Sequence, residues 1–145
     1  MKSKPADKIQ DLQFFGEFGG VNPSISDSST YTFLSAKSMS ETFEGNTDGC
    51  YLYSRNSSPS NLYLEEALAA MEETESANVF SSGMAAITSS ILQIFKSDDH
   101  IISSRTIYGG TYAFLKNFTP KFNIKTSFVD TSKPEEIIKA ITSKT

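Results

Sequence analysis

The sequence predicts an α/β fold in which an extended N-terminal arm precedes the first part of a mainly parallel sheet covered by helices. From residue 61 onward, helical and strand patterns alternate in the order helix, strand, helix, strand, helix, strand, helix, which is typical of parallel sheets. The first 60 residues follow neither the two-residue period of a strand nor the period of about 3.6 residues of a helix. We therefore expect an arm over residues 1–60 and the first part of a sheet domain over residues 61–145.

The arm is rich in aromatic residues although it shows no clear element. A structureless stretch of this length is unusual in a compact domain, and disorder would leave many aromatic side chains in water. We therefore expect the arm to pack on another body, such as a second copy of the chain, with a short strand or turn around Tyr31 to Phe33. The aromatic residues concerned are Phe14, Phe15, Phe18, Tyr31, Phe33 and Phe43.

Tyr53 and Arg55 lie two residues apart near the end of the arm. An extended backbone would point both side chains to the same side. A guanidinium offers a fork of donors, so the pair could clamp an anion. The alternative is that Tyr53 packs on the protein while Arg55 is solvated, and the spacing alone favours this alternative.

The first predicted helix begins at Pro59, with apolar residues on one face. Its other face is acidic, which predicts a solvated surface. The acidic residues are Glu65, Glu66, Glu72 and Glu73.

Residues 77–90 form the stretch around which the chain is organised. A strand is expected over residues 77–80, a turn over residues 81–83 and a helix from Met84 to about Lys96. The N-terminus of such a helix presents unpaired N–H groups and a positive dipole end, which suit a phosphate. Serine and glycine before a helix are also ordinary capping residues, so this stretch alone leaves both interpretations open.

The remaining elements are expected in regular order. After a short strand over residues 100–103, Tyr108 stands beside two glycines in a loop at the strand's carboxyl end, where open parallel sheets bind ligands. A helix over residues 111–118 and a strand over residues 124–129 follow. Residues 132–135 (Ser-Lys-Pro-Glu) form the pattern of a capping box with proline in the first turn, and predict the start of a last helix.

The composition argues against several classes of protein. A formal net charge of −4 gives no basic surface for nucleic acid, and no apolar run reaches the roughly 18 residues of a membrane span. No apolar segment follows the charged N-terminus, so no signal peptide is expected. The single cysteine, Cys50, rules out a disulfide within the chain, and a cytoplasmic location is expected.

Cys50 and His100 are the only cysteine and histidine of the sequence. They are too few for a usual zinc site, so no metal is predicted. They could pair as nucleophile and base, but Cys50 falls in a polar loop and His100 opens an apolar strand. A structural role is the favoured interpretation for both.

Three patches occur in one order: Tyr-Ser-Arg at 53–55 followed by Ser-Pro-Ser at 58–60, Ser-Gly-Met-Ala-Ala at 82–86, and Tyr-Gly-Gly-Thr-Tyr at 108–112. In this combination the chain resembles the Cys/Met-metabolism family of pyridoxal-phosphate enzymes, which includes methionine γ-lyase, the cystathionine lyases, cystathionine γ-synthase and the O-acetylhomoserine sulfhydrylases. The resemblance covers residues 49–130. Ser58 departs from the family pattern, which commonly has asparagine before the proline.

The resemblance implies a fold, a cofactor and roles for particular residues. The fold would be an incomplete large domain of the type I PLP-dependent transferase kind, and the cofactor pyridoxal 5'-phosphate. Gly83 and Met84 would donate backbone N–H groups to its phosphate, with Ser82 shaping the turn. Tyr53 and Arg55 would reach the phosphate of a neighbouring subunit's cofactor. Tyr108 would stack on the pyridine ring of the cofactor and act as an acid or base near the leaving group of the substrate.

The family's reactive lysine, which forms a Schiff base with the cofactor, is not expected in this chain. Lys133 and Lys144 follow serines but come too early, and we interpret both as surface residues. The resemblance therefore implies the N-terminal part of a homotetrameric (dimer of dimers) lyase or transferase of trans-sulfuration, acting by γ-elimination or γ-replacement on methionine, cystathionine or O-acyl-homoserine. The alternatives are an inactive fragment that only folds or self-associates and, less favoured, a generic phosphate- or nucleotide-binding domain.

Overall fold

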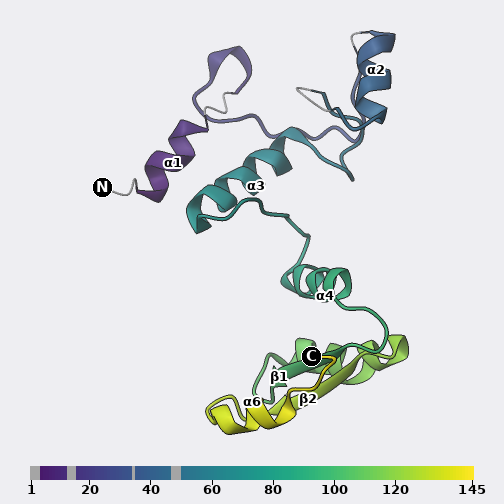
Figure 1. Cartoon of the computed structure of the whole chain (residues 1–145). Coiled ribbons are helices and arrows are strands. Elements are labelled where there is room, and N and C mark those ends of the chain that lie inside the picture. Colours follow the sequence, from purple (N-terminus) through teal and green to yellow (C-terminus); the bar gives the residue numbers. More distant parts are fainter. Residues whose placement is uncertain (1–3, 13–15, 34, 47–49) are drawn as a thin grey trace. The chain divides into compact units, whose positions relative to one another are not determined.

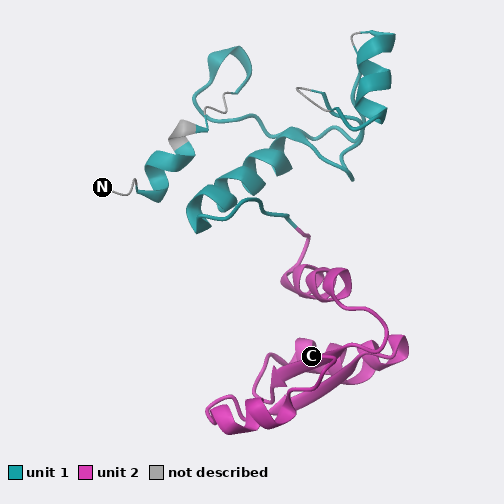
Figure 2. Cartoon of the chain, in the orientation of Figure 1, with its two compact units in different colours: residues 1–79 teal, residues 80–145 magenta. Residues whose placement is uncertain are grey.

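The computed structural model describes residues 4–12, 16–33, 35–46 and 50–145. The chain divides into two compact units, residues 1–79 and residues 80–145 (Figure 2). This division lies after Val79, whereas the boundary expected at residue 60 separates a proposed arm from a proposed cofactor domain and stays a prediction. Phe14 and Phe15 of the arm lie outside the described residues.

The first unit contains more regular structure than the arm pattern predicted. Its elements are α1 (Pro5–Asp11), the 3-10 turn η1 (Glu17–Gly19), α2 (Ala36–Phe43) and α3 (Pro59–Glu72) (Figure 1). Helix α2 begins with a reciprocal capping box, in which the Ser35 and Ser38 side chains each accept the other's backbone N–H. The short strand or turn expected at Tyr31 to Phe33 is not formed, and a single antiparallel bridge joins Thr30 to Tyr53 instead.

Helix α3 begins where the sequence predicted. Pro59 is the first helical residue, and the buried Ser58 side chain caps the helix by accepting the Asn61 N–H at 3.2 Å. The acidic face is solvated in part: Glu72 and Glu73 are exposed as predicted, whereas Glu65 and Glu66 are half-buried. Glu65 accepts the Val79 N–H at 3.0 Å, and Glu73 pairs with Lys8 of α1, which packs against α3.

The second unit contains the parallel sheet. Its elements are α4 (Gly83–Ile94), β1 (His100–Ser104), α5 (Gly109–Ala113), a π-helical turn η2 (Phe114–Phe118), a 3-10 turn η3 (Thr119–Phe122), β2 (Lys125–Val129) and α6 (Pro134–Ala140). Strands β1 and β2 pair in parallel, with His100 opposite Lys125 and Ser104 opposite Val129. The order of elements from residue 83 onward and the parallel pairing confirm the prediction.

Residues 77–80 form no strand, which corrects the prediction for this segment. A strand needs a neighbour to which its N–H and C=O groups can bond. In the described parts of the chain, the only sheet consists of β1 and β2. The N–H of Val79 bonds the Glu65 carboxylate instead of a strand.

The capping box expected before α6 is also absent. Pro134 occupies the first turn as predicted, but the residue at the cap position is Lys133, whose side chain makes no capping bond. The Ser132 hydroxyl donates to Asp130 Oδ1 at 2.6 Å, and Glu136, not Glu135, accepts the Asp130 N–H at 3.0 Å. Asp130 Oδ1 also accepts the Ser132 N–H at 3.2 Å, which is the donor that a capping-box glutamate would have bound.

A small apolar core holds the second unit together. Ile101 of β1, Leu115 of η2 and Ile124 before β2 are buried against one another, with four half-buried residues around them. Thr119 is fully buried and donates its hydroxyl to the Leu115 carbonyl at 2.9 Å. The residues around the core are Ile91, Phe95, Phe114 and Phe128.

His100 is buried at the start of β1, and both of its ring nitrogens have partners. Nδ1 lies 2.8 Å from the Thr145 hydroxyl and Nε2 lies 2.8 Å from the Ser127 hydroxyl. This arrangement agrees with the structural role favoured from the sequence.

Acid is expected to destabilise the second unit through Asp130. Hydrogen bonds from the side chain and backbone of Ser132 lower the pKa of Asp130, and the Arg105 guanidinium, whose Nη2 lies 2.6 Å from Oδ2, lowers it further. Because the folded pKa is below the unfolded one, the stabilisation is present above the unfolded pKa and lost as the pH falls through the folded pKa. We expect the melting temperature to decrease when the pH is lowered below roughly 4.

Thermal melts followed by circular dichroism measure this effect at pH values from about 6 to about 3, a range that spans the ordinary pKa of a carboxyl group, roughly 4. Asp130→Asn should flatten the acid-induced fall, while Asp27→Asn, a change at an exposed residue of the first unit, should leave it intact. Identical pH profiles for the wild-type chain and Asp130→Asn would contradict the prediction.

Candidate cofactor site

The N-terminus of α4 is an open, capped helix end. The Ser82 hydroxyl accepts the Ala85 N–H at 3.1 Å, and the Ser82 carbonyl accepts the Ala86 N–H at 3.1 Å. The N–H groups of Gly83 and Met84 precede these bonds, so the helix itself provides no acceptors for them. A Cβ on Gly83 would meet no atom within 4 Å. Among the described residues, neither of these N–H groups has an acceptor in the helix, and the space beside Gly83 is open.

Tyr108 lies beside this helix end. It precedes α5, after the carboxyl end of β1, and its side chain is 70% exposed. A Cβ built on Gly110 would lie 2.7 Å from Tyr108 Cε1 and 3.1 Å from Met84 Sδ. The Thr111 hydroxyl lies 3.8 Å from the same sulfur, which it can approach as a donor. The structure thus brings Tyr108 together with the first turn of α4, two positions that are far apart in the sequence.

Tyr53 and Arg55 also lie together, but for a different reason from the one predicted. The Arg55 guanidinium carbon lies 5.2 Å from the centre of the Tyr53 ring, within range of a cation–π contact. The backbone is not extended here, because the Asn56 and Ser57 N–H groups both donate to the Tyr53 carbonyl and close a turn. Both side chains are exposed. This pair belongs to the first unit, whereas Ser82, Gly83, Met84 and Tyr108 belong to the second.

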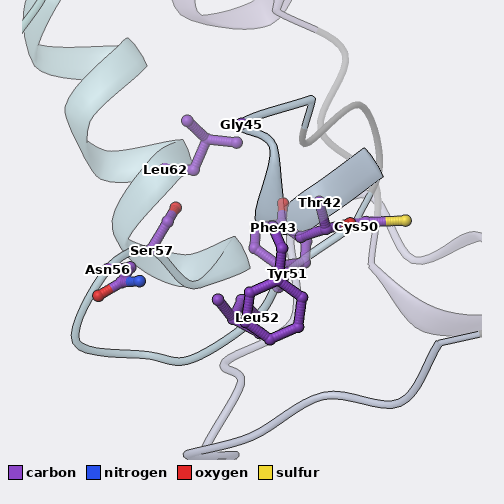
Figure 3. Close-up of a pocket in the computed structure, with 9 residues that line it drawn as sticks. All are labelled: Thr42, Phe43, Gly45, Cys50, Tyr51, Leu52, Asn56, Ser57 and Leu62. Carbon is purple, nitrogen blue, oxygen red and sulfur yellow. The ribbon is translucent and has the colours of Figure 1, made fainter. Parts of the chain in front are cut away.

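The first unit also holds a pocket that no sequence pattern predicted. Its volume is about 360 Å³, and it lies between the end of α2, the loop from Cys50 to Ser57 and Leu62 of α3 (Figure 3). Phe43, Leu52 and Leu62 make it partly apolar. Burial raises the pKa of Tyr51, whose ring lies 5.3 Å from that of Tyr31. The pocket is assembled from separate segments, so only folding creates it.

The described residues contain neither a metal-binding cluster nor a helix that could span a membrane. Among them, no three histidine, cysteine, aspartate or glutamate side chains are grouped so that they could hold a metal ion. Within the same residues, no helix combines the length and the apolar character that crossing a membrane requires.

Comparison with known proteins identifies the family. A family described as Cys/Met metabolism PLP-dependent enzyme matches residues 8–145. The chain belongs to this family. The chain is 42% identical over 142 residues to methionine gamma-lyase of Arabidopsis thaliana, covering 94% of this chain and 32% of that protein. It is 32% identical over 143 residues to cystathionine beta-lyase MetC of Staphylococcus haemolyticus, covering 99% of this chain and 34% of that protein.

Solved structures agree with this membership of the Cys/Met metabolism family. The chain matches metB from Corynebacterium glutamicum with a TM-score of 0.83 and 27% identity, covering 99% of this chain and 36% of that one. It matches a putative O-acetylhomoserine (thiol)-lyase from Campylobacter jejuni, solved with a pyridoxyl-lysine monophosphate, with a TM-score of 0.87, 24% identity and the same coverage. At 24% identity, the match to the Campylobacter jejuni structure establishes a shared fold and nothing more. The chain spans about a third of the length of the relatives that it matches.

The predicted α/β class is confirmed by the short parallel sheet and by these structural likenesses. The sequence patterns had pointed to Tyr108 and Met84 separately, but gave no indication that both lie close to Gly110. Gly110 and Thr111, which lie beside Met84, were part of the recognised motif and received no role. A glycine next to an aromatic residue is the sequence signal that could have pointed to Gly110, because a glycine allows another group to approach the backbone closely.

Proposed function

We propose that this chain supplies the N-terminal part of the cofactor cradle in a PLP-dependent enzyme of sulfur amino-acid metabolism. The observation that carries the proposal is the meeting of the open α4 N-terminus and the Tyr108 side chain in a member of this family. When bound, pyridoxal phosphate supplies an electron sink for γ-elimination or γ-replacement. The substrate class is methionine, cystathionine or an O-acyl-homoserine, a proposal supported by the names of the relatives.

The residues of the second unit fit the phosphate and ring of this cofactor. The Gly83 and Met84 N–H groups would hold the phosphate, while the Ser82 side chain fixes the turn by its bond to Ala85. The exposed Tyr108 ring would lie against the pyridine ring. Its hydroxyl would move a proton near the leaving group of the substrate.

Tyr53 and Arg55 would clamp the phosphate of a neighbouring subunit's cofactor. The turn Ser81–Met84 contains no charged side chain, so an exposed arginine would supply the positive charge that a phosphate attracts. Exposed apolar side chains in the same unit, including Phe18, Val21 and Ile25, support an arm that packs on another copy. A homo-oligomer, built as a dimer of dimers, is therefore the proposed assembly.

The reactive lysine is proposed to lie outside this chain. Lys133 is half exposed and pairs with Asp130 and Glu136, which supports a surface role. Ile94, Ile138 and other apolar residues of the second unit are exposed and would be covered by the rest of such an enzyme. Catalysis by these residues alone is therefore not expected. Borohydride-stable labelling of one lysine of this chain by pyridoxal phosphate, with turnover of methionine, would overturn this view.

An inactive fragment that folds or self-associates is the second candidate, supported by the share of about a third of its relatives that the chain spans. A cytoplasmic location is supported by the use of a single cysteine in the whole sequence.

Gly83→Asp is expected to weaken binding of pyridoxal phosphate by about tenfold, because a carboxylate at the α4 N-terminus would repel the phosphate. The fold should be kept, since the added side chain meets open space and aspartate is favourable in the first turn of a helix. Fluorescence titration of the full chain with pyridoxal phosphate measures the affinity. Ser35→Asp at the cap of α2 adds the same charge elsewhere and should change nothing. Equal affinity of Gly83→Asp and the wild-type chain would contradict the phosphate site, and a wild-type chain that binds no cofactor would favour the inactive fragment.

A further inference from the structure

Helix α5 begins with two adjacent glycines whose surroundings differ. A Cβ on Gly109 would meet no atom within 4 Å. A Cβ on Gly110 would lie 2.7 Å from Tyr108 Cε1, closer than side-chain atoms normally come, and 3.1 Å from Met84 Sδ. The space that a side chain of Gly110 would need is therefore already filled by an aromatic ring and a thioether.

The backbone gives no other reason for a glycine at position 110. The described glycines with positive φ are Gly19 and Gly45, so Gly109 and Gly110 have backbone angles that other residues adopt readily. Alanine is also the stronger helix former at both positions. What distinguishes Gly110 from Gly109 is thus the close approach of Tyr108 and Met84 alone.

The thioether beside Gly110 is itself held in place. The Thr111 side chain is buried, with 3% of its surface exposed, and its hydroxyl lies 3.8 Å from Met84 Sδ. Packing of α4 against α5 brings these residues together. The Met84 sulfur and the edge of the Tyr108 ring therefore both border the space that a Cβ of residue 110 would occupy. An added methyl group at position 110 would meet the ring at the shorter distance, 2.7 Å, and the ring is 70% exposed, so the ring would move.

We propose that Gly110 is a positioning residue, which holds the Tyr108 ring beside the α4 N-terminus by leaving free the space that the ring edge occupies. The inference rests on the proposed function, since the ring so placed is the one that would lie against the pyridine ring of the cofactor. Gly110 itself touches neither cofactor nor substrate. Its contribution is the orientation of the aromatic ring, and the N–H donors of Gly83 and Met84 do not depend on it.

Gly110→Ala and the matched control Gly109→Ala test this inference in the full chain. Each adds one methyl group to the first turn of α5, but only the first has no room for it. Methyl NMR of methionine-labelled protein, with the Met84 signal assigned through Met84→Leu, reports the position of the ring, because an aromatic ring shifts the resonances of nearby methyl groups. Gly110→Ala should move the Met84 signal, as should Tyr108→Leu, while Gly109→Ala should leave it in place.

Two ligands separate a positioning role from a merely structural one. Gly110→Ala should weaken pyridoxal phosphate by about tenfold, through loss of an aromatic contact, and should leave the affinity for inorganic phosphate unchanged. Gly109→Ala should leave both affinities unchanged. Equal weakening of both ligands, or an unmoved Met84 signal in Gly110→Ala, would overturn the inference. Far-ultraviolet circular dichroism verifies that each variant is folded.

The outcome for the wild-type chain distinguishes this inference from the proposed function. A wild-type chain that binds neither pyridoxal phosphate nor inorganic phosphate would count against the proposed function. The Met84 signal would then decide the position of the ring by itself: a shift in Gly110→Ala that is absent in Gly109→Ala supports the role of Gly110, and the absence of that difference refutes it.

Discussion

Leu115→Ala is expected to lower the free energy of unfolding of the second unit by about 3 kcal/mol, because it removes a buried side chain and leaves a cavity. Only 2% of the Leu115 surface is exposed, and its neighbours in the core are Ile101 and Ile124. A small core has few other contacts to compensate. A loss of this size is a large part of the stability of an ordinary domain. Urea denaturation followed by circular dichroism measures it.

Ile138→Ala is the control for this prediction. Ile138 lies on α6 in the same unit, and 68% of its surface is exposed. Its truncation should change the free energy of unfolding by about 0.5 kcal/mol or less. Similar losses for the two variants would mean that Leu115 does not lie in the core described here.

Arg55→Ala is expected to weaken retention of pyridoxal phosphate by roughly tenfold to a hundredfold, the effect of losing charge-assisted hydrogen bonds. Arg55→Lys should restore only part of the affinity, since an ammonium keeps the charge but lacks the planar fork. Lys37→Ala removes the same charge from an exposed position on α2 and should have no effect. Equilibrium dialysis against pyridoxal phosphate gives the comparison. Undiminished affinity in Arg55→Ala would contradict the clamp.

Mixing two defective variants tests whether the clamp acts between subunits. Arg55→Ala chains have an intact α4 N-terminus, and Gly83→Asp chains have an intact Arg55. If the arm of one chain serves the cradle of another, co-refolded mixtures should regain tight binding in a minority of sites. If both parts serve the same chain, the mixture should bind no better than either variant alone. This outcome would exclude the proposed arrangement between subunits.

The elements that the sequence predicted well are those with a local signal. The apolar segments that became β1 and β2, and the turns before α3 and α4, are encoded by neighbouring residues such as Pro59 and Ser82. Helices α1 and α2 were missed because they are short and mostly polar. Helix α2 does place Ala36, Met39 and Phe43 at helical spacing, but three residues in a stretch rich in serine and threonine are a weak signal. Residues 77–80 have the composition of a strand, but a strand also depends on a partner, and none pairs with them in the described chain.

The candidate site shows the same division. Tyr53 and Arg55 lie close in the sequence, so their proximity could be predicted, although a turn and not an extended backbone produces it. The contact between Met84 and the loop of Tyr108 could not, because it depends on α4 packing against α5. The different roles of Gly109 and Gly110 follow from that packing and have no local signal.

The sequence by itself determined the α/β class, the order of the elements from α4 to α6 and the identity of the residues in the three motifs, because periodicity, capping and turn preferences act over a few neighbouring residues. The tertiary structure alone decided which of these residues meet. It placed both Tyr108 and Met84 close to Gly110, buried Leu115 and Thr119, and gave Asp130 its hydrogen bonds. These contacts join residues distant in the chain, and the shape of the packed side chains, rather than any local preference, selects them.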